Sequence, residues 1–273
     1  MIETTHLFPV LHQKLIELLR SLQPDDWNKK TIAKLWTVKD VAAHILDTNL
    51  RTLSFSRDKH MLQPSAEINT YPDLVEYLNK LNAEWVTASK RLSAGLITSL
   101  LEVKGKEYYN YQFTLDPGAE ANFPVAWAGE TRSKNWFHIA RDYTENWHHQ
   151  QQIRDATGKQ DIMTKELFYP VMDTFMRGLP YTYRNTRAEE GTTIQFTIDT
   201  EIGGSWFISR NNNGWQLSQQ AHSVIHASLI IQPDTAWKLF TKGISPAVAM
   251  ETSLISGDEK LAVVGLTLVA VMA

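Results

Sequence analysis

The chain contains no cysteine among its 273 residues. This absence excludes disulfide bonds, thiolate metal ligands and a nucleophilic thiol carried by the protein itself. If the protein performs thiol chemistry, the thiol must therefore arrive as part of a small molecule.

The sequence also has little excess charge and no long apolar run. Its formal net charge is −3, with no block of like charges, so we expect no nucleic-acid partner. The N-terminus lacks the basic and apolar regions of a signal peptide. The most apolar stretch, Leu261 to Ala273, is too short to span a membrane and predicts a buried helix. We therefore expect a cytoplasmic protein without membrane contact, whose oligomeric state the sequence does not reveal.

Apolar periodicity predicts a helical N-terminal domain over residues 1–160. Thr37 and Asp40 resemble a capping box at the start of the second helix. Pro117-Gly118 and the aromatic run before it predict a hairpin or ordered loop between Leu100 and Asn135. Four helices are expected, at about Thr5–Leu22, Val38–Ser56, Pro72–Leu96 and His138–Gly158. Four helices of this length favour a four-helix bundle.

Residues 161–273 carry a different pattern, which predicts a smaller α+β domain with an antiparallel sheet. Asn213-Gly214 is a hairpin turn signal between two alternating segments. Helices are expected at Thr164–Met176, from Pro233 to Gly243 and at Leu261–Ala273. Strands are expected at Thr192–Asp199, Gly204–Arg210, Trp215–Gln220, His222–Gln232 and Val248–Ser256.

The helix from His138 to Gly158 has an unusually polar face. Along that face, at helical spacing, lie His138, Asp142, Glu145, His149 and Gln152. Such a face is costly to bury unless it binds something. Glu145 and His149 are four residues apart, so both can reach one metal ion.

His44, in the second predicted helix, can supply a third ligand to Glu145 and His149. Three protein ligands with one open position are typical of a catalytic zinc site. Nitrogen and carboxylate ligands also suit nickel, iron or manganese, and zinc is preferred here because it is the most frequent. Taken alone, His44 is better explained as a half-buried histidine bonded to a backbone carbonyl, and the pair on the other helix is what favours a ligand.

Two motifs resemble the DinB-like metal-binding bundles. WTVKDVAAHILD is similar to their second-helix signature and ENWHHQQQIRDATG to their last-helix signature. The Glu-x-x-x-His form is that of the mycothiol-dependent maleylpyruvate isomerase branch, whereas other DinB-like members carry histidine in place of that glutamate. In the C-terminal half, AWKLFTKG and METSLISGDEKLA resemble the sterol-carrier-like domain of the same branch.

The resemblance implies that His44, Glu145 and His149 ligate a divalent metal. It also implies a small-molecule substrate and a low-molecular-weight thiol, used for isomerisation or for S-transfer. A divalent cation lowers the pKa of a bound thiol, so the thiolate can attack at neutral pH. For isomerisation it would add to a cis double bond, allow rotation and leave.

The branch also places a basic residue from its C-terminal domain near the substrate. Where relatives typically carry Arg-Gly, this chain has Lys242-Gly243, and Arg210 is a second candidate for that catalytic role. Lysine does not replace a bidentate arginine–carboxylate contact, so the substrate is left open.

Some neighbours of the proposed ligands are candidates for orienting them, and others are not expected to take part in the site. Asp142, Gln152 and His138 can orient the ligand histidines or line the pocket. His148 points about 100° away from His149 on an ideal helix, so we expect a surface or interdomain residue. Asp47 is expected on a solvated face.

Two other functions stay open. One is a non-catalytic stress or regulatory protein that binds a metal in the bundle and an apolar ligand in the C-terminal half. The other is a metal-dependent hydrolase, for which Asp142 or His138 would have to serve as general base.

Overall fold

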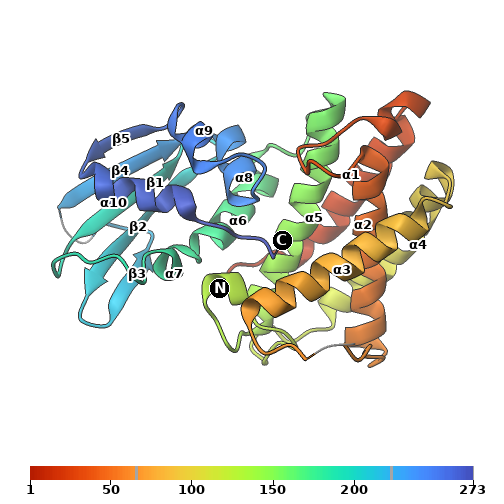
Figure 1. The fold of residues 1–273 in the computed structure, drawn as a ribbon, viewed down its shortest axis with the longest axis horizontal. Helices are drawn as coiled ribbons and strands as arrows, with labels where there is room; N and C mark the ends of the chain where they lie inside the picture. Colours follow the sequence, from red (N-terminus) through yellow and green to blue (C-terminus); the bar gives the residue numbers. More distant parts are fainter. Residues whose placement is uncertain (65–66, 222–223, 273) are drawn as a thin grey trace.

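The computed structural model describes residues 1–64, 67–221 and 224–272. Its N-terminal part is helical and its C-terminal part carries a five-stranded sheet flanked by helices (Figure 1). The N-terminal helices are α1 (Phe8–Ser21), α2 (Val38–Thr52), α3 (Tyr71–Ser89), α4 (Ala94–Phe113) and α5 (Asn135–Thr157). Short helical turns η1 (Thr5–Leu7), η2 (Pro24–Asn28), η3 (Leu53–Arg57) and η4 (Ala126–Ala128) complete this part. The expected fold class, a helical region followed by a smaller α+β region, is confirmed.

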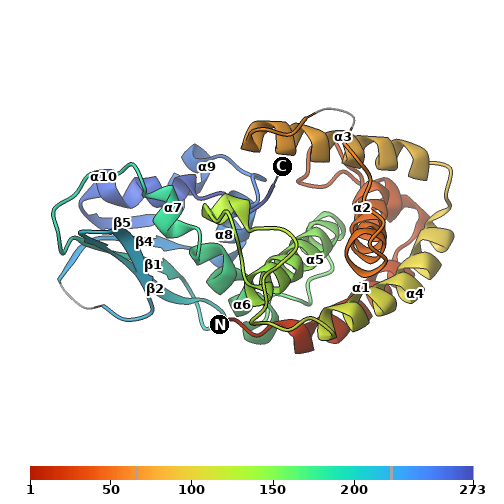
Figure 2. The same cartoon turned by 90° about the horizontal axis from the view of Figure 1, so that it is seen from below.

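The four helices packed into a bundle are α1, α2, α4 and α5, and α3 packs on the outside against α2 (Figure 2). The prediction of a hairpin or loop at Leu100–Asn135 is wrong from Leu100 to Phe113, because α4 runs to Phe113. Gly105 lies inside α4 and faces α1. A Cβ at this position would overlap the imidazole of His12. The glycine therefore permits close packing of α4 against α1.

The C-terminal part has one sheet with strand order β3-β2-β1-β4-β5. Its strands are β1 (Thr193–Ile198), β2 (Gly204–Asn211), β3 (Gly214–Ser218), β4 (Ile225–Ile231) and β5 (Leu254–Gly257). The pairs β1–β2, β2–β3 and β4–β5 are antiparallel as expected. The pair β1–β4 is parallel, so the sheet is mixed and the expectation of a wholly antiparallel sheet is wrong.

Helices around the sheet are α6 (Lys165–Met176), α7 (Leu179–Thr182), α8 (Pro233–Phe240), α9 (Pro246–Met250), α10 (Glu259–Ala262) and the turn η5 (Val263–Thr267). The strand expected at Val248–Ser256 begins only at Leu254, because Ser245 caps the short helix α9 through the backbone of Val248. The prediction of a long helix at Leu261–Ala273 is also wrong. Only α10 and η5 form there, and Ala273 lies outside the described residues.

A shared apolar cluster joins the bundle to the sheet part. Trp147 of α5 is fully buried, and its ring lies edge-on to Trp237 of α8 with centroids 6.3 Å apart. Its indole nitrogen donates to the backbone oxygen of Ile162 at 3.2 Å. An ion pair of 3.0 Å between Lys238 and Asp155 lies at the same junction. Helix α5 is therefore held from both sides, which fixes the orientation of its polar face.

Within the described residues, no helix combines the length and apolar character needed to cross a membrane.

Candidate metal centre

The first element of the site is the start of α2. Thr37 caps this helix by accepting a hydrogen bond from the backbone of Asp40, and the Asp40 carboxylate accepts one from the backbone of Thr37. The capping box expected from the sequence is therefore formed. Beyond it, His44 lies buried beneath the ring of Trp36, with centroids 4.7 Å apart.

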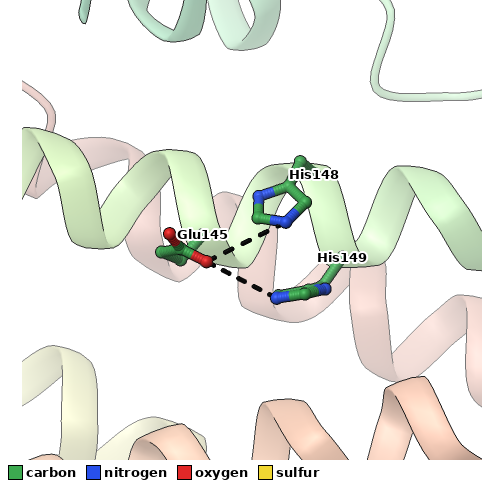
Figure 3. A group of neighbouring side chains, drawn as sticks. All are labelled: Glu145, His148 and His149. Carbon is green, nitrogen blue, oxygen red and sulfur yellow. Dashed lines mark ion pairs between the residues drawn. The ribbon is translucent and has the colours of Figure 1, made fainter. Parts of the chain in front are cut away.

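The second element is the polar face of α5, from which Glu145, His148 and His149 converge (Figure 3). One ligand atom from each lies within 4.8 Å of the others. The Glu145 carboxylate is 3.5 Å from Nε2 of His149 and 3.9 Å from Nε2 of His148. Glu145 has the most exposed side chain of the three, at 27%, so solvent reaches the cluster on its side.

The expectation of a surface position for His148 is wrong, since this residue is only 3% exposed. Adjacent residues do diverge by about 100° around a helix. Glu145, however, is three residues before His148 and four before His149, and both spacings place side chains side by side. The two imidazoles therefore lie against each other, and both face the same carboxylate.

His44 approaches this cluster from α2. Its ring meets that of His149 edge-on, with centroids 4.6 Å apart. Its Nδ1 is buried and has no hydrogen-bond partner among the described residues. A buried nitrogen without a partner is costly, and binding a cation would satisfy it. The structure thus brings the three predicted ligands into one region, with His44 outside the tighter group that Glu145 forms with the two α5 histidines.

Hydrogen bonds on the far side of two imidazoles favour one tautomer. Nδ1 of His148 lies 2.9 Å from the backbone oxygen of Thr144, and Nδ1 of His149 lies 3.0 Å from Oε1 of Gln152. An oxygen acceptor keeps the proton on Nδ1, which leaves Nε2 with a free lone pair on the side of Glu145. Gln152 is placed where the sequence suggested a supporting residue.

The charge state of these groups suits a metal ion. Burial lowers the pKa of His148 to about 4, and the pKa of His44 lies well below its usual value for the same reason. Burial opposes the charge of Glu145, but His148, His149 and Arg141 together hold its pKa below the usual value. Neutral imidazoles beside an ionised carboxylate form the donor set that a divalent cation requires. The residues present therefore fit a metal.

Asp142 lies in a neighbouring network on the α4 side of α5. It accepts hydrogen bonds from Gln112 at 2.9 Å, from Tyr108 at 3.3 Å and from Arg141 at 2.8 Å. Its remaining neighbour is His138, whose Nε2 is 3.6 Å away. The described contacts of Asp142 thus join α5 to α4, and they include none of the three proposed ligands.

Burial lowers the pKa of His138 to about 4, and its Nδ1 lies 3.0 Å from the guanidinium of Arg141. The sequence interpretation missed Arg141, although it precedes Glu145 by four residues, the spacing that selected His149. Tyr108 and Gln112 show that spacing too, but their segment was assigned to a hairpin. Asp47 is buried beside Arg51 at 3.0 Å, so its expected solvated position is wrong.

The two basic candidates of the C-terminal part lie in different places. Lys242 is exposed in the turn after α8 and has a φ of 62°. The next residue, Gly243, approaches the bundle so closely that a Cβ would lie 2.9 Å from Ile32. This turn therefore packs on the segment that leads to Trp36 and His44. Arg210 lies near the end of β2 opposite Trp215 of β3, and its described contacts stay within the sheet part.

Comparison with known proteins assigns the sequence to a family. The sequence profile of the mycothiol maleylpyruvate isomerase N-terminal domain matches residues 8–154, which is more than half of the chain. The chain belongs to this family. A search of curated proteins finds no match.

Two solved structures are similar over most of the molecule. A histidine-to-alanine mutant of the mycothiol-dependent maleylpyruvate isomerase is 10% identical, with a TM-score of 0.54, over 92% of this chain and 91% of that chain. A second structure of the mycothiol-dependent maleylpyruvate isomerase is 11% identical, with a TM-score of 0.49, over 86% of each chain. At this identity, the similarity to the first structure establishes the fold alone. It covers both the helical part and the sheet part.

Proposed function

We propose that this protein is a divalent-metal-dependent enzyme that uses a low-molecular-weight thiol, either for cis–trans isomerisation of a small molecule or for S-transfer. The observation that carries the proposal is the convergence of Glu145 and His149 on α5 with His44 on α2. Membership of the maleylpyruvate isomerase family supports the reaction class. Because the chain has no cysteine, the thiol must be supplied from outside.

In this proposal His44, Glu145 and His149 hold the metal, with zinc first and nickel, iron or manganese as alternatives. When bound, the cation would lower the pKa of a coordinated thiol and so supply a nucleophilic thiolate. Gln152 keeps the proton of His149 on Nδ1, and Trp36 covers His44 on one side. The more exposed Glu145 marks the side from which thiol and substrate enter.

His148 is the observation that favours a second candidate function. Its Nε2 lies 3.9 Å from the Glu145 carboxylate, so it can act as a fourth protein donor. A fourth protein ligand is typical of structural sites, which lack an open position. In that case the protein would be a non-catalytic metal-binding protein, with an apolar ligand in the C-terminal half.

Support for the hydrolase alternative is weaker. It requires a general base near the open position, and Asp142 and His138 were the candidates. The carboxylate of Asp142 already accepts three hydrogen bonds, and His138 contacts the Arg141 guanidinium.

The test is metal content followed by turnover. Protein purified without chelator should carry about one divalent ion per chain, and His149→Ala should remove it. His6, which is exposed at the N-terminus, provides the matched control variant His6→Ala. The loaded protein is then assayed with a panel of thiols and cis-unsaturated acids. Absence of bound metal in the wild type would refute the proposal, and metal without turnover for any thiol would favour the binding protein.

Three further predictions from the sequence accompany this proposal. We propose a division into domains 1–160 and 161–273. We also propose a cytoplasmic location and the absence of a nucleic-acid partner.

A further inference from the structure

Arg141 is a buried cation on α5, about one helical turn before the proposed ligand Glu145. It precedes Glu145 by four residues on α5, so the two side chains share one helix face. Its side chain is only 16% exposed. The charge of Arg141 acts on Glu145 and helps to keep that carboxylate ionised. The neighbourhood of the proposed centre therefore contains a guanidinium as well as metal donors.

The guanidinium is only partly engaged. Its Nη2 donates to Oδ1 of Asp142 at 2.8 Å and lies 3.0 Å from Nδ1 of His138. Its Nε is buried and has no partner among the described residues. Arginine has five N–H donors, and a buried donor without an acceptor costs free energy. The Arg141 side chain can therefore donate a hydrogen bond to a further oxygen acceptor.

Asp142, in contrast, has its full set of partners. Two donors from α4, Tyr108 and Gln112, share the carboxylate with Arg141. Because these neutral donors also stabilise the Asp142 charge, the carboxylate does not depend on Arg141 alone. Arg141 is thus positioned by Asp142 and still has hydrogen-bonding capacity for a ligand.

In the C-terminal part, the turn after α8 that packs on the bundle carries the exposed Lys242. A lysine provides a single point charge rather than the planar fork that matches a carboxylate. The planar guanidinium of Arg141 on α5 provides such a fork.

From these contacts we propose that Arg141 is a specificity-determining residue, which binds a carboxylate of the substrate beside the metal centre. The proposal rests on the function proposed above, because it assigns an additional residue to the same site. It makes the bundle, rather than the sheet part, the source of the charged contact that selects an anionic substrate.

Arg177, which directly follows the last residue of α6, offers a closely matched control. Its Nη2 contacts a buried aspartate, Asp173, at 3.3 Å, and its Nε is also buried without a partner among the described residues. Asp173 accepts a second hydrogen bond, from Trp206 at 2.8 Å. Arg177 therefore reproduces the local arrangement of Arg141 but lies at the C-terminal end of α6, which carries none of the proposed ligands.

The experiment compares Arg141→Met, Arg141→Lys and Arg177→Met with the wild type. Metal content is measured first, and then the affinity for maleate and for its uncharged diamide, by calorimetry. We expect Arg141→Met to keep the metal and to lose about 10- to 100-fold in affinity for maleate, the usual range for a charge-assisted contact. Arg141→Lys should lose less, Arg177→Met nothing, and the affinity for the diamide should not change.

Several outcomes would overturn the assignment. Maleate affinity within twofold of wild type in Arg141→Met would do so, as would equal losses in Arg141→Met and Arg177→Met. If Arg141→Met does not fold, the double variant Arg141→Met, Asp142→Asn removes both charges together. Retained maleate affinity in that variant would equally contradict the role of Arg141. A wild type that binds no metal refutes the proposed function instead, and maleate binding by the metal-free variants then still decides the role of Arg141.

Discussion

Gln152 contacts His149 on the side of the imidazole away from Glu145, where its Oε1 lies 3.0 Å from Nδ1. An acceptor at this position fixes the tautomer and the ring orientation of a metal ligand. We expect Gln152→Leu to weaken zinc affinity by about 10- to 100-fold, the range found when such supporting residues are removed. Competition with a chelator of known affinity measures this change.

Gln160 provides the control for that substitution. It accepts a hydrogen bond from Gln151, on another face of α5, and is exposed. Gln160→Leu should leave zinc affinity unchanged. A similar loss in both variants would mean that Gln152 acts through stability and not through His149.

The pH dependence of stability should reflect His138. Its folded-state pKa is about 4, whereas an unfolded histidine titrates near 6.5. Between these values the unfolded state binds one proton more than the folded state, so stability falls as the pH decreases from 6.5 to 4. The shift corresponds to roughly 3 kcal/mol from this residue.

Urea unfolding of the metal-free protein at pH 7, 5.5 and 4 measures this effect. His138→Gln keeps an acceptor for Arg141 and should remove about one proton from the slope of stability against pH. An unchanged slope would show that His138 is protonated to the same extent in both states.

The sequence was informative where one local signal was sufficient. Thr37 and Asp40 predicted the start of α2, and helical spacing placed Glu145 beside His149. The prediction failed for a residue that stands in more than one helical spacing to its neighbours. A rule for adjacent residues excluded His148, although its i–3 relation to Glu145 brings the imidazole to the carboxylate. The aromatic run before Pro117-Gly118 suggested a loop, because the packing of α4 against α1, where Gly105 meets His12, cannot be recognised within a single segment.

Two equivalent capping boxes allow the role of α2 to be tested. Thr37 caps α2, which carries His44, and Thr70 caps α3, which carries none of the proposed ligands. Thr37→Ala and Thr70→Ala should each cost about 1 kcal/mol of stability, the usual effect of losing such a cap. Only Thr37→Ala should also weaken zinc binding, because it loosens the helix that presents His44. Equal zinc affinities in the two variants would argue against His44 as a ligand.

His148 decides between an open and a closed metal centre. The ring of His148 lies against that of His149, with centroids 3.9 Å apart, and both Nε2 atoms face Glu145. If the protein is an enzyme, His148 does not occupy the position required by the thiol. We then expect His148→Ala to retain about one metal ion per chain, whereas His149→Ala loses it. The absorption spectrum of the cobalt-substituted protein should stay unchanged in His148→Ala and shift when a thiol is added. Loss of metal in both variants, together with a spectrum insensitive to thiols, would identify a four-ligand site and favour the metal-binding protein over the enzyme.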